Sequence, residues 1–243
     1  MPYTGVKGHI ELERVALDLL RPIVARYGAT LTSGTFAGRG DIEYAPETKV
    51  LDLQELTLHG LCMDYAYRKR TVEPVKTAAQ ATAETAAEVS NKPGVLLKAR
   101  RIVADGATVG FVNEESQPHY RVFLADTNLV VENFTNQRTE GTATAQLRGR
   151  SVGGGATVAS ATFRPETNGP DFDLNVRIEN TDMHAMNDLL RAHATFDVSS
   201  GVFSVFSELH VKNGRVTGYV KPLFRDLKVY DAAQDEENRW GRS

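Results

Sequence analysis

Apolar and polar residues alternate along three stretches of the chain, residues 142–148, 171–178 and 203–212. Successive side chains of a β-strand point to opposite faces, so each stretch predicts a strand with one apolar and one wet face. Such strands are typical of an antiparallel sheet that is covered on one side only. The chain is therefore expected to build a sheet whose two faces differ in chemistry.

Two short dipeptides are strong turn signals. Asp105-Gly106 separates the apolar-rich stretches 95–104 and 107–113, and Asn213-Gly214 follows stretch 203–212. Both dipeptides suit type I′ turns, whose central residues need positive φ and whose twist matches that of the flanking strands. Each dipeptide therefore predicts an antiparallel hairpin.

Residues 49–67 change the phase of their alternation twice. Leu51 and Leu53 share one phase, Leu56 and Leu58 share the other, and the first phase returns at Leu61. Phase changes inside a long strand indicate β-bulges, here near Gln54-Glu55 and near Gly60. Because bulges bend and twist a strand, the sheet is expected to curl.

Three helices are expected, over residues 17–27, 74–90 and 183–193. In the first, Leu19, Leu20, Ile23 and Val24 form one apolar stripe. The second is rich in alanine, with high helix propensity but a thin apolar face, and it stops before Pro93-Gly94. We interpret it as a helix that crosses the sheet rather than one that fills a core.

The two ends of the chain resemble each other. Each reads as a helix, then Ser33-Gly34-Thr35-Phe36 or Ser200-Gly201-Val202-Phe203, then a hairpin. The alternative is that helix-to-strand junctions converge on Ser-Gly through turn chemistry. A true repeat implies an open sheet of stacked units, each of which buries its neighbour's edge.

These patterns together predict a β-rich α+β fold. The sheet is long, twisted, mostly antiparallel and of the open-groove type, with helices at its ends and one Ala-rich crossing helix. The expected units are a first helix–hairpin β-unit over 1–70, the Ala-rich helix or linker over 71–94, a second β-unit with a C-terminal helix–hairpin over 95–232, and a polar tail over 233–243.

Composition narrows the function classes. The 243 residues are enough for one large or two small domains at roughly 150 residues each, and one cysteine cannot close an internal disulfide. A net charge of −3 does not fit the basic face that nucleic acid requires. No apolar run approaches the roughly 20 residues of a membrane helix, and we expect the sequence to be a fragment of a longer chain.

Catalytic and metal motifs are weak. None of the six histidines has the H-E-x-x-H spacing of a zinc site. Residues 171–175 resemble the opening of a calcium loop, but Val176 replaces the glycine that the loop needs. A hydrolase would require two or more of His59, Asp64, Cys62 and His119 to converge in a pocket. We therefore expect no enzyme activity, no catalytic residues, no cofactor and no metal.

Two basic runs, 68–70 and 98–101, flank the Ala-rich helix. Clustered cations attract anionic lipid head groups. The alternative is that each run is a solvated strand end.

Several segments, in order, resemble the C-terminal region of the AsmA-like family of bacterial envelope proteins, many of unknown function. Residues 8–67 are similar to the preceding unit of that family, so the resemblance covers most of the chain. The segments that carry it are Asn91-Lys92-Pro93-Gly94, Tyr120–Leu124, Asn133–Gln137, Phe163-Arg164-Pro165 with Gly169–Phe172, Met186–Ala192 and Gly218-Tyr219-Val220-Lys221-Pro222-Leu223-Phe224.

The resemblance implies a periplasmic protein, tethered to the inner membrane by a segment absent from this chain. It also implies a curved β-groove that holds phospholipid acyl chains, in phospholipid transport or outer-membrane homeostasis. The expected partners are phospholipid and further β-units of a longer chain or other envelope proteins. The alternative is a structural or protein-interaction domain of the envelope without lipid. The one-sided strands and the resemblance together predict these lipid-facing residues: Leu174, Val176, Ile178, Phe203, Val205 and Leu209.

Overall fold

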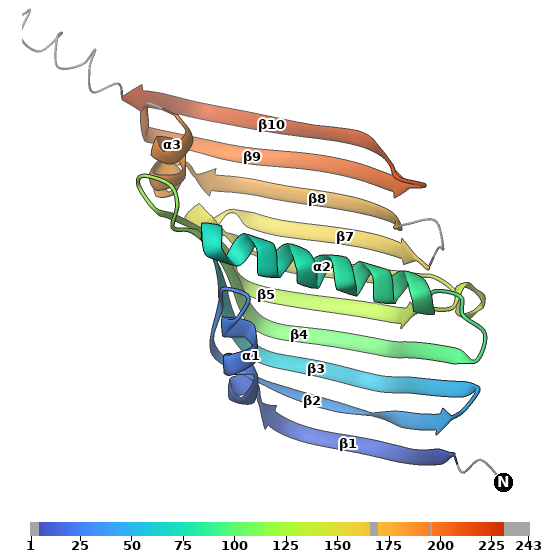
Figure 1. Ribbon diagram of the computed structural model, residues 1–243. Helices are drawn as coiled ribbons and strands as arrows, with labels where there is room; N and C mark the ends of the chain where they lie inside the picture. Colours follow the sequence, from blue (N-terminus) through green and yellow to red (C-terminus); the bar gives the residue numbers. More distant parts are fainter. Residues whose placement is uncertain (1–4, 166–169, 195, 231–243) are drawn as a thin grey trace, which may run out of the picture.

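The computed structural model describes residues 5–165, 170–194 and 196–230, and its ten strands form one open sheet in which spatial order equals chain order (Figure 1). As expected, the fold is β-rich and mostly antiparallel. The polar tail expected over 233–243 lies outside the described residues. The strands are β1 (Val6–Ala16), β2 (Ala29–Ala45), β3 (Thr48–Tyr67), β4 (Val95–Asn113), β5 (Tyr120–Thr135), β6 (Ala143–Ser151), β7 (Ala156–Arg164), β8 (Asp171–Asp182), β9 (Asp197–Lys212) and β10 (Arg215–Tyr230).

Short helices lie at the connections. They are the 3₁₀ turns η1 (Leu17–Leu20), η2 (Arg138–Glu140), η3 (Val152–Gly154) and η4 (His184–Met186), and the α-helices α1 (Arg21–Ala25), α2 (Lys69–Val89) and α3 (Asn187–His193). The helices expected over 17–27 and 183–193 are therefore each a 3₁₀ turn followed by a short α-helix. Of the residues predicted to form one apolar stripe on the first helix, Leu19, Leu20 and Ile23 are 74%, 41% and 52% exposed, so the stripe is largely left in water.

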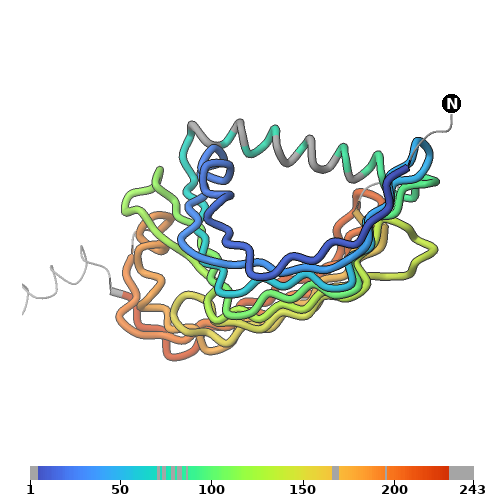
Figure 2. The backbone as a smooth tube through the Cα atoms, turned by 90° about the horizontal axis from the view of Figure 1, so that it is seen from below, coloured from blue at the N-terminus to red at the C-terminus, as the bar shows by residue number. Residues whose placement is uncertain are grey.

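Only one junction of the sheet is parallel. β3 and β4 run in the same direction, with Leu51 opposite Leu97 and Tyr65 opposite Phe111. Parallel neighbours need a long crossover connection, which α2 supplies. Figure 2 shows that the sheet is curved and that α2 spans its concave side.

The curvature follows a row of positive-φ residues that crosses the sheet. Such residues interrupt a ladder and bend the strand that carries them. The bulges predicted near Gln54-Glu55 and Gly60 are confirmed, because the pairing of β2 with β3 shifts at both places. The bend residues, in strand order, are Arg14, Gly34, Gly60, Gly106, Asp126, Asn180, Gly201 and Asp226.

The two dipeptide signals have different outcomes. Asn213-Gly214 forms the predicted hairpin turn between β9 and β10, with φ values of 52° and 70°. The hairpin predicted at Asp105-Gly106 is wrong, because β4 continues through both residues. Gly106 instead takes a φ of 62° as a bulge, where the pairing of β4 with β5 shifts.

The two ends of the chain are built alike. In the first, a Cβ on Gly34 would lie 2.8 Å from Leu17 Cδ1 and 3.1 Å from the Cα of Leu61. In the second, a Cβ on Gly201 would lie 3.5 Å from Met183 Sδ and 3.2 Å from the Cα of Leu227. Because neither glycine has a Cβ, both the buried side chain of Leu17 or Met183 and the backbone of the next strand can approach it closely.

A small core lies at this bend in both units. Leu17 and Leu31 are buried in the first, and Met183 and Val198 in the second. Val198 lies three residues before Gly201, as Leu31 lies three before Gly34. We call β1–η1–α1–β2–β3 the first unit and β8–η4–α3–β9–β10 the second unit.

Candidate functional site

The six residues predicted to face lipid share one face of the sheet. Leu174 pairs with Leu209, and Ile178 pairs with Val205. Val176 lies between the two β8 residues in the alternation, and Phe203 lies two positions before Val205. All six side chains are half-buried. The structure therefore brings the predicted residues into one contiguous strip over β8 and β9.

The same face continues across neighbouring strands. On β7, Ala161 and Ala159 pair with Leu174 and Val176, and they pair in turn with Ala145 and Leu147 of β6. Leu147 then pairs with Leu129 of β5. Sequence reasoning missed the β5 and β7 members, since short alanines and a bulged strand give only a weak alternation signal. On β10 the face carries Val220, Pro222 and Phe224, which pair with Ser207, Val205 and Phe203.

This apolar strip lies on the side of the sheet that carries the helices. Gly201, whose Cβ would point at Met183 beside η4, precedes Phe203 and Val205 at intervals of two residues. The helices lie in front of the strands in Figure 1, and Figure 2 places α2 on the concave side. We call the half-buried apolar residues of β5–β9 on this side, together with the exposed Val220, Pro222 and Phe224 of β10, the concave strip.

The opposite, convex face is charged and paired. Arg164 reaches Asp171 at 2.9 Å and Asp173 at 2.7 Å, and His210 Nδ1 lies 2.7 Å from Asp173. Lys212 Nζ lies 3.2 Å from Asp171, the carboxylate of which is almost fully buried. The strands thus separate apolar from ionic side chains across the thickness of the sheet.

These pairs shift the pKa values of the two carboxyl groups. Burial raises the pKa of Asp171, but the hydrogen bond from Arg164 and the contact with Lys212 outweigh it, so the net pKa lies below its ordinary value. The hydrogen bond from His210, followed by that from Arg164, lowers the pKa of Asp173. Both carboxyl groups therefore have pKa values below the ordinary one, which favours their charged forms.

The convex face also has a shallow hollow of about 210 Å³ over β7–β10. Arg177, Phe206, Glu208 and Tyr219 line part of it. Burial, followed by the hydrogen bond to Glu208, raises the pKa of the Tyr219 phenol. Most of the lining lies on the face away from the concave strip, although Val176 of the strip also borders the hollow.

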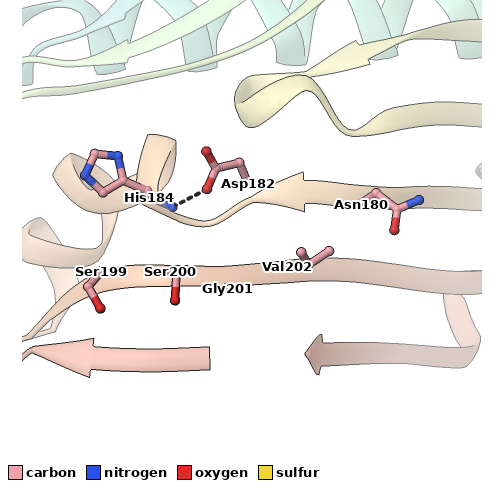
Figure 3. A pocket seen from close by; sticks show the side chains of 7 residues that line it. All are labelled: Asn180, Asp182, His184, Ser199, Ser200, Gly201 and Val202. Carbon is pink, nitrogen blue, oxygen red and sulfur yellow. Dashed lines mark hydrogen bonds between the residues drawn. The ribbon is translucent and has the colours of Figure 1, made fainter. Parts of the chain in front are cut away.

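A larger open pocket, of about 570 Å³, lies where β8 and β9 bend (Figure 3). Asp182 Oδ1 accepts a hydrogen bond from the amide of His184, and Ser199 donates to the carbonyl of Lys228. Among the described residues, neither Ser199 nor Ser200 forms a hydrogen bond with His184. The pocket therefore does not hold a serine that is paired with a histidine base. The lining residues are Asn180, Asp182, His184, Ser199, Ser200, Gly201 and Val202.

The four residues of which a hydrolase would need at least two together have other neighbours. Asp64 forms an ion pair with Arg121 at 2.9 Å, and His59 Nδ1 lies 3.6 Å from Asp105. Within the described ranges, no hydrogen bond or ion pair joins His59, Asp64, Cys62 and His119, and no group of three or more His, Cys, Asp or Glu could hold a metal ion.

The basic runs that flank α2 carry ion pairs of their own. Arg68 pairs with Glu114, Lys98 with Glu140 at 2.6 Å, and Arg100 with Asp52 at 2.8 Å. Arg101 likewise lies 3.2 Å from Glu132. Neutralised cations attract anionic head groups less strongly, which favours solvated runs over lipid binding, and the first run lies at the start of α2 while the second lies near the start of β4.

No model of a known protein family and no curated protein matches the chain. In the part of the chain that the structure describes, none of the helices has the length and apolar character needed to cross a membrane.

Proposed function

We propose that this protein is a non-enzymatic, AsmA-like module in which the concave strip forms an open groove that shelters lipid acyl chains. Its role would be phospholipid transport or outer-membrane homeostasis. The observation that supports the proposal best is the concave strip itself, which is apolar over β5–β10, half-buried on β5–β9 and exposed on β10. The same proposal includes an α+β fold class and a sheet that forms an open groove.

The physical basis is the transfer of methylene groups from water. Each buried CH₂ contributes about 0.8 kcal/mol, so an acyl chain laid along several strands gains substantially. The strip presents Leu, Val, Ala and Phe side chains, while Arg164, Asp173 and His210 pair on the other face. An acyl chain on the concave side therefore meets no unpaired charge from this cluster.

The proposed location is the periplasm, with the module tethered to the inner membrane by a segment outside this chain. This part of the proposal rests on the resemblance to AsmA-like proteins. The separation of apolar and charged faces is consistent with a carrier that works in water and holds its cargo on one side.

Native mass spectrometry of the purified protein, with lipid extraction from the same sample, tests the proposal. We expect co-purifying phospholipid that Leu209→Asp removes, because a carboxylate in the middle of the strip must be desolvated against the acyl chain. Ser160→Asp is the matched control, since Ser160 is exposed on the convex face of β7.

Circular dichroism must show that both variants are folded. A folded Leu209→Asp variant that still carries lipid contradicts the proposal, as does a folded wild-type protein without any lipid. The second outcome favours the alternative, a structural or interaction domain of the envelope, which the exposed apolar residues of β10 support.

A further inference from the structure

The last strand of the sheet leaves one of its edges unpaired. β10 pairs with β9 on one side, and among the described residues no strand pairs with its other side. An exposed edge strand of this length is a template for a further strand. Its exposed large apolar residues are Val216, Tyr219, Val220, Leu223, Phe224, Leu227 and Val229.

The first unit shows how an equivalent edge is occupied. Leu227 corresponds to Leu61, since each lies beside the bend glycine of the preceding strand. By the same correspondence Phe224 matches Leu58, which β4 covers with Ala104. Phe224 is 55% exposed, whereas Leu58 is half-buried. The β10 edge therefore lacks a neighbour that the β3 edge possesses.

The β3–β4 junction also gives the direction and alignment of that neighbour. It is parallel, and its constant register places bend residue Gly60 opposite bend residue Gly106. β1 and β10 run in the same direction, because a single parallel junction and eight antiparallel ones separate them. A second copy placed beside β10 in the same orientation therefore presents β1 as a parallel strand.

We propose that β10 pairs in parallel with β1 of a second copy of this chain, with the bend residues Asp226 and Arg14 opposite each other. This alignment keeps the row of bend residues continuous across the two copies. The pairing does not depend on lipid and stands apart from the proposed carrier function.

The side chains match in this register. Arg14 faces Asp226, Glu13 faces Arg225, and Leu12 faces Phe224 on the concave side. Glu11 lies between the positions of Lys221 and Arg225 on the convex side. Within the described residues, Glu11, Glu13, Arg14 and Lys221 make no ion pair of their own. Opposite charges and apolar groups thus meet along the same strand.

Pro222 sets a limit on the pairing. It has no amide hydrogen, so the ladder beside Ile10 of the second copy lacks one hydrogen bond. The pairing is heterologous, because the two copies use different edges, and each product keeps one free β1 and one free β10. Association is therefore expected to give a concentration-dependent ladder of species rather than a closed dimer.

Cysteine cross-linking of the whole chain tests the register. In a Cys62→Ser background, Glu13→Cys and Arg225→Cys proteins are mixed and oxidised, and we expect a disulfide-linked heterodimer. Neighbouring residues of paired strands lie within the Cα range that a disulfide spans. The control uses Thr217→Cys in place of Arg225→Cys. Thr217 lies on the same strand and the same face, but the proposed register places it far from Glu13 of the second copy.

Sedimentation of charge-reversal variants tests whether these opposite charges stabilise the association. Lys221→Glu with Arg225→Glu is expected to weaken association about tenfold, and mixing with Glu11→Lys, Glu13→Lys protein is expected to restore it. Three results overturn the proposal: a monomer at every concentration, equal cross-linking of the Thr217→Cys control, or Arg225→Cys homodimers alone. The last would indicate two-fold pairing of β10 with itself.

Discussion

The first and second units have the same local construction but different surroundings. Each has a bend glycine, Gly34 or Gly201, against which a buried Leu17 or Met183 packs. The outer edge of β3 is covered by β4, whereas no strand among the described residues pairs with that of β10. The apolar side chains of β10 are thus exposed because no described strand lies beside its outer edge. In composition, β10 resembles a strand that has a neighbour on both edges.

The largest effect on stability is expected from substitutions that truncate a buried side chain in the small core of each unit. Leu31→Ala is expected to lower the free energy of unfolding by about 2–4 kcal/mol, through lost burial and a residual cavity. Val198→Ala should cost about 1–3 kcal/mol, since two carbon atoms are removed rather than three. Urea denaturation measures both values. A loss below about 0.5 kcal/mol at either site would show that the two bends do not carry equivalent cores.

An intermediate effect is expected from the charged cluster at the start of β8, where Asp171 is buried, whereas the ion pairs at the start of β1 in the first unit are exposed. Asp171→Asn should lower stability at neutral pH by about 1–2 kcal/mol, because Arg164 and Lys212 lose their charged partner. The folded pKa of Asp171 lies below the unfolded value of 3.8, so its contribution is present above that pH and is lost as the pH falls through the folded value.

The difference between wild type and Asp171→Asn should accordingly shrink below about pH 4, as followed by circular dichroism during acid titration. Asp126→Asn serves as the control, because its side chain is 79% exposed and lies 3.7 Å from Arg150. An equal difference at pH 3 and pH 7 would assign the effect to packing rather than charge.

The smallest effect distinguishes the covered edge from the open one. Leu58→Ala is expected to cost about 1–2 kcal/mol, since Leu58 pairs beside Ala104 across the parallel junction. Phe224→Ala should cost less than about 1 kcal/mol in the monomer, despite the larger side chain, because Phe224 is already exposed. Thermal unfolding at low protein concentration compares the two. A larger loss at Phe224 would mean that the edge is covered in solution.

Local signals in the sequence predicted the strands, the bulges and one of the two hairpins. Asn213 and Gly214 both take positive φ, whereas of Asp105-Gly106 only the glycine does. A hairpin turn and a bulge both favour a glycine with positive φ, so the dipeptide alone does not distinguish them, and the pairing of the flanking segments decides. Residues 107–113 continue along β3 in parallel, which local chemistry does not encode.

The concave strip was predictable on β8 and β9 and less so elsewhere. Alternation alone assigns Leu174 and Leu209 to an apolar face, and the register confirms that they lie together. It does not indicate which face is concave, because curvature arises from bend residues on different strands acting together. Asp126 and Asn180 take positive φ without glycine, so the sequence gives little sign of them.

The agreement between strand order and chain order has a kinetic consequence. Every described strand pairs with those adjacent to it in the sequence, so most connections that must be closed are short and their closure costs little entropy. During synthesis, which starts at the N-terminus, the chain can add one hairpin at a time. The single exception is β4, which docks on β3 only after all of α2 has been synthesised. We expect this junction to set the folding rate, and substitutions at Leu56 or Ile102 to slow folding more than equivalent ones in β7.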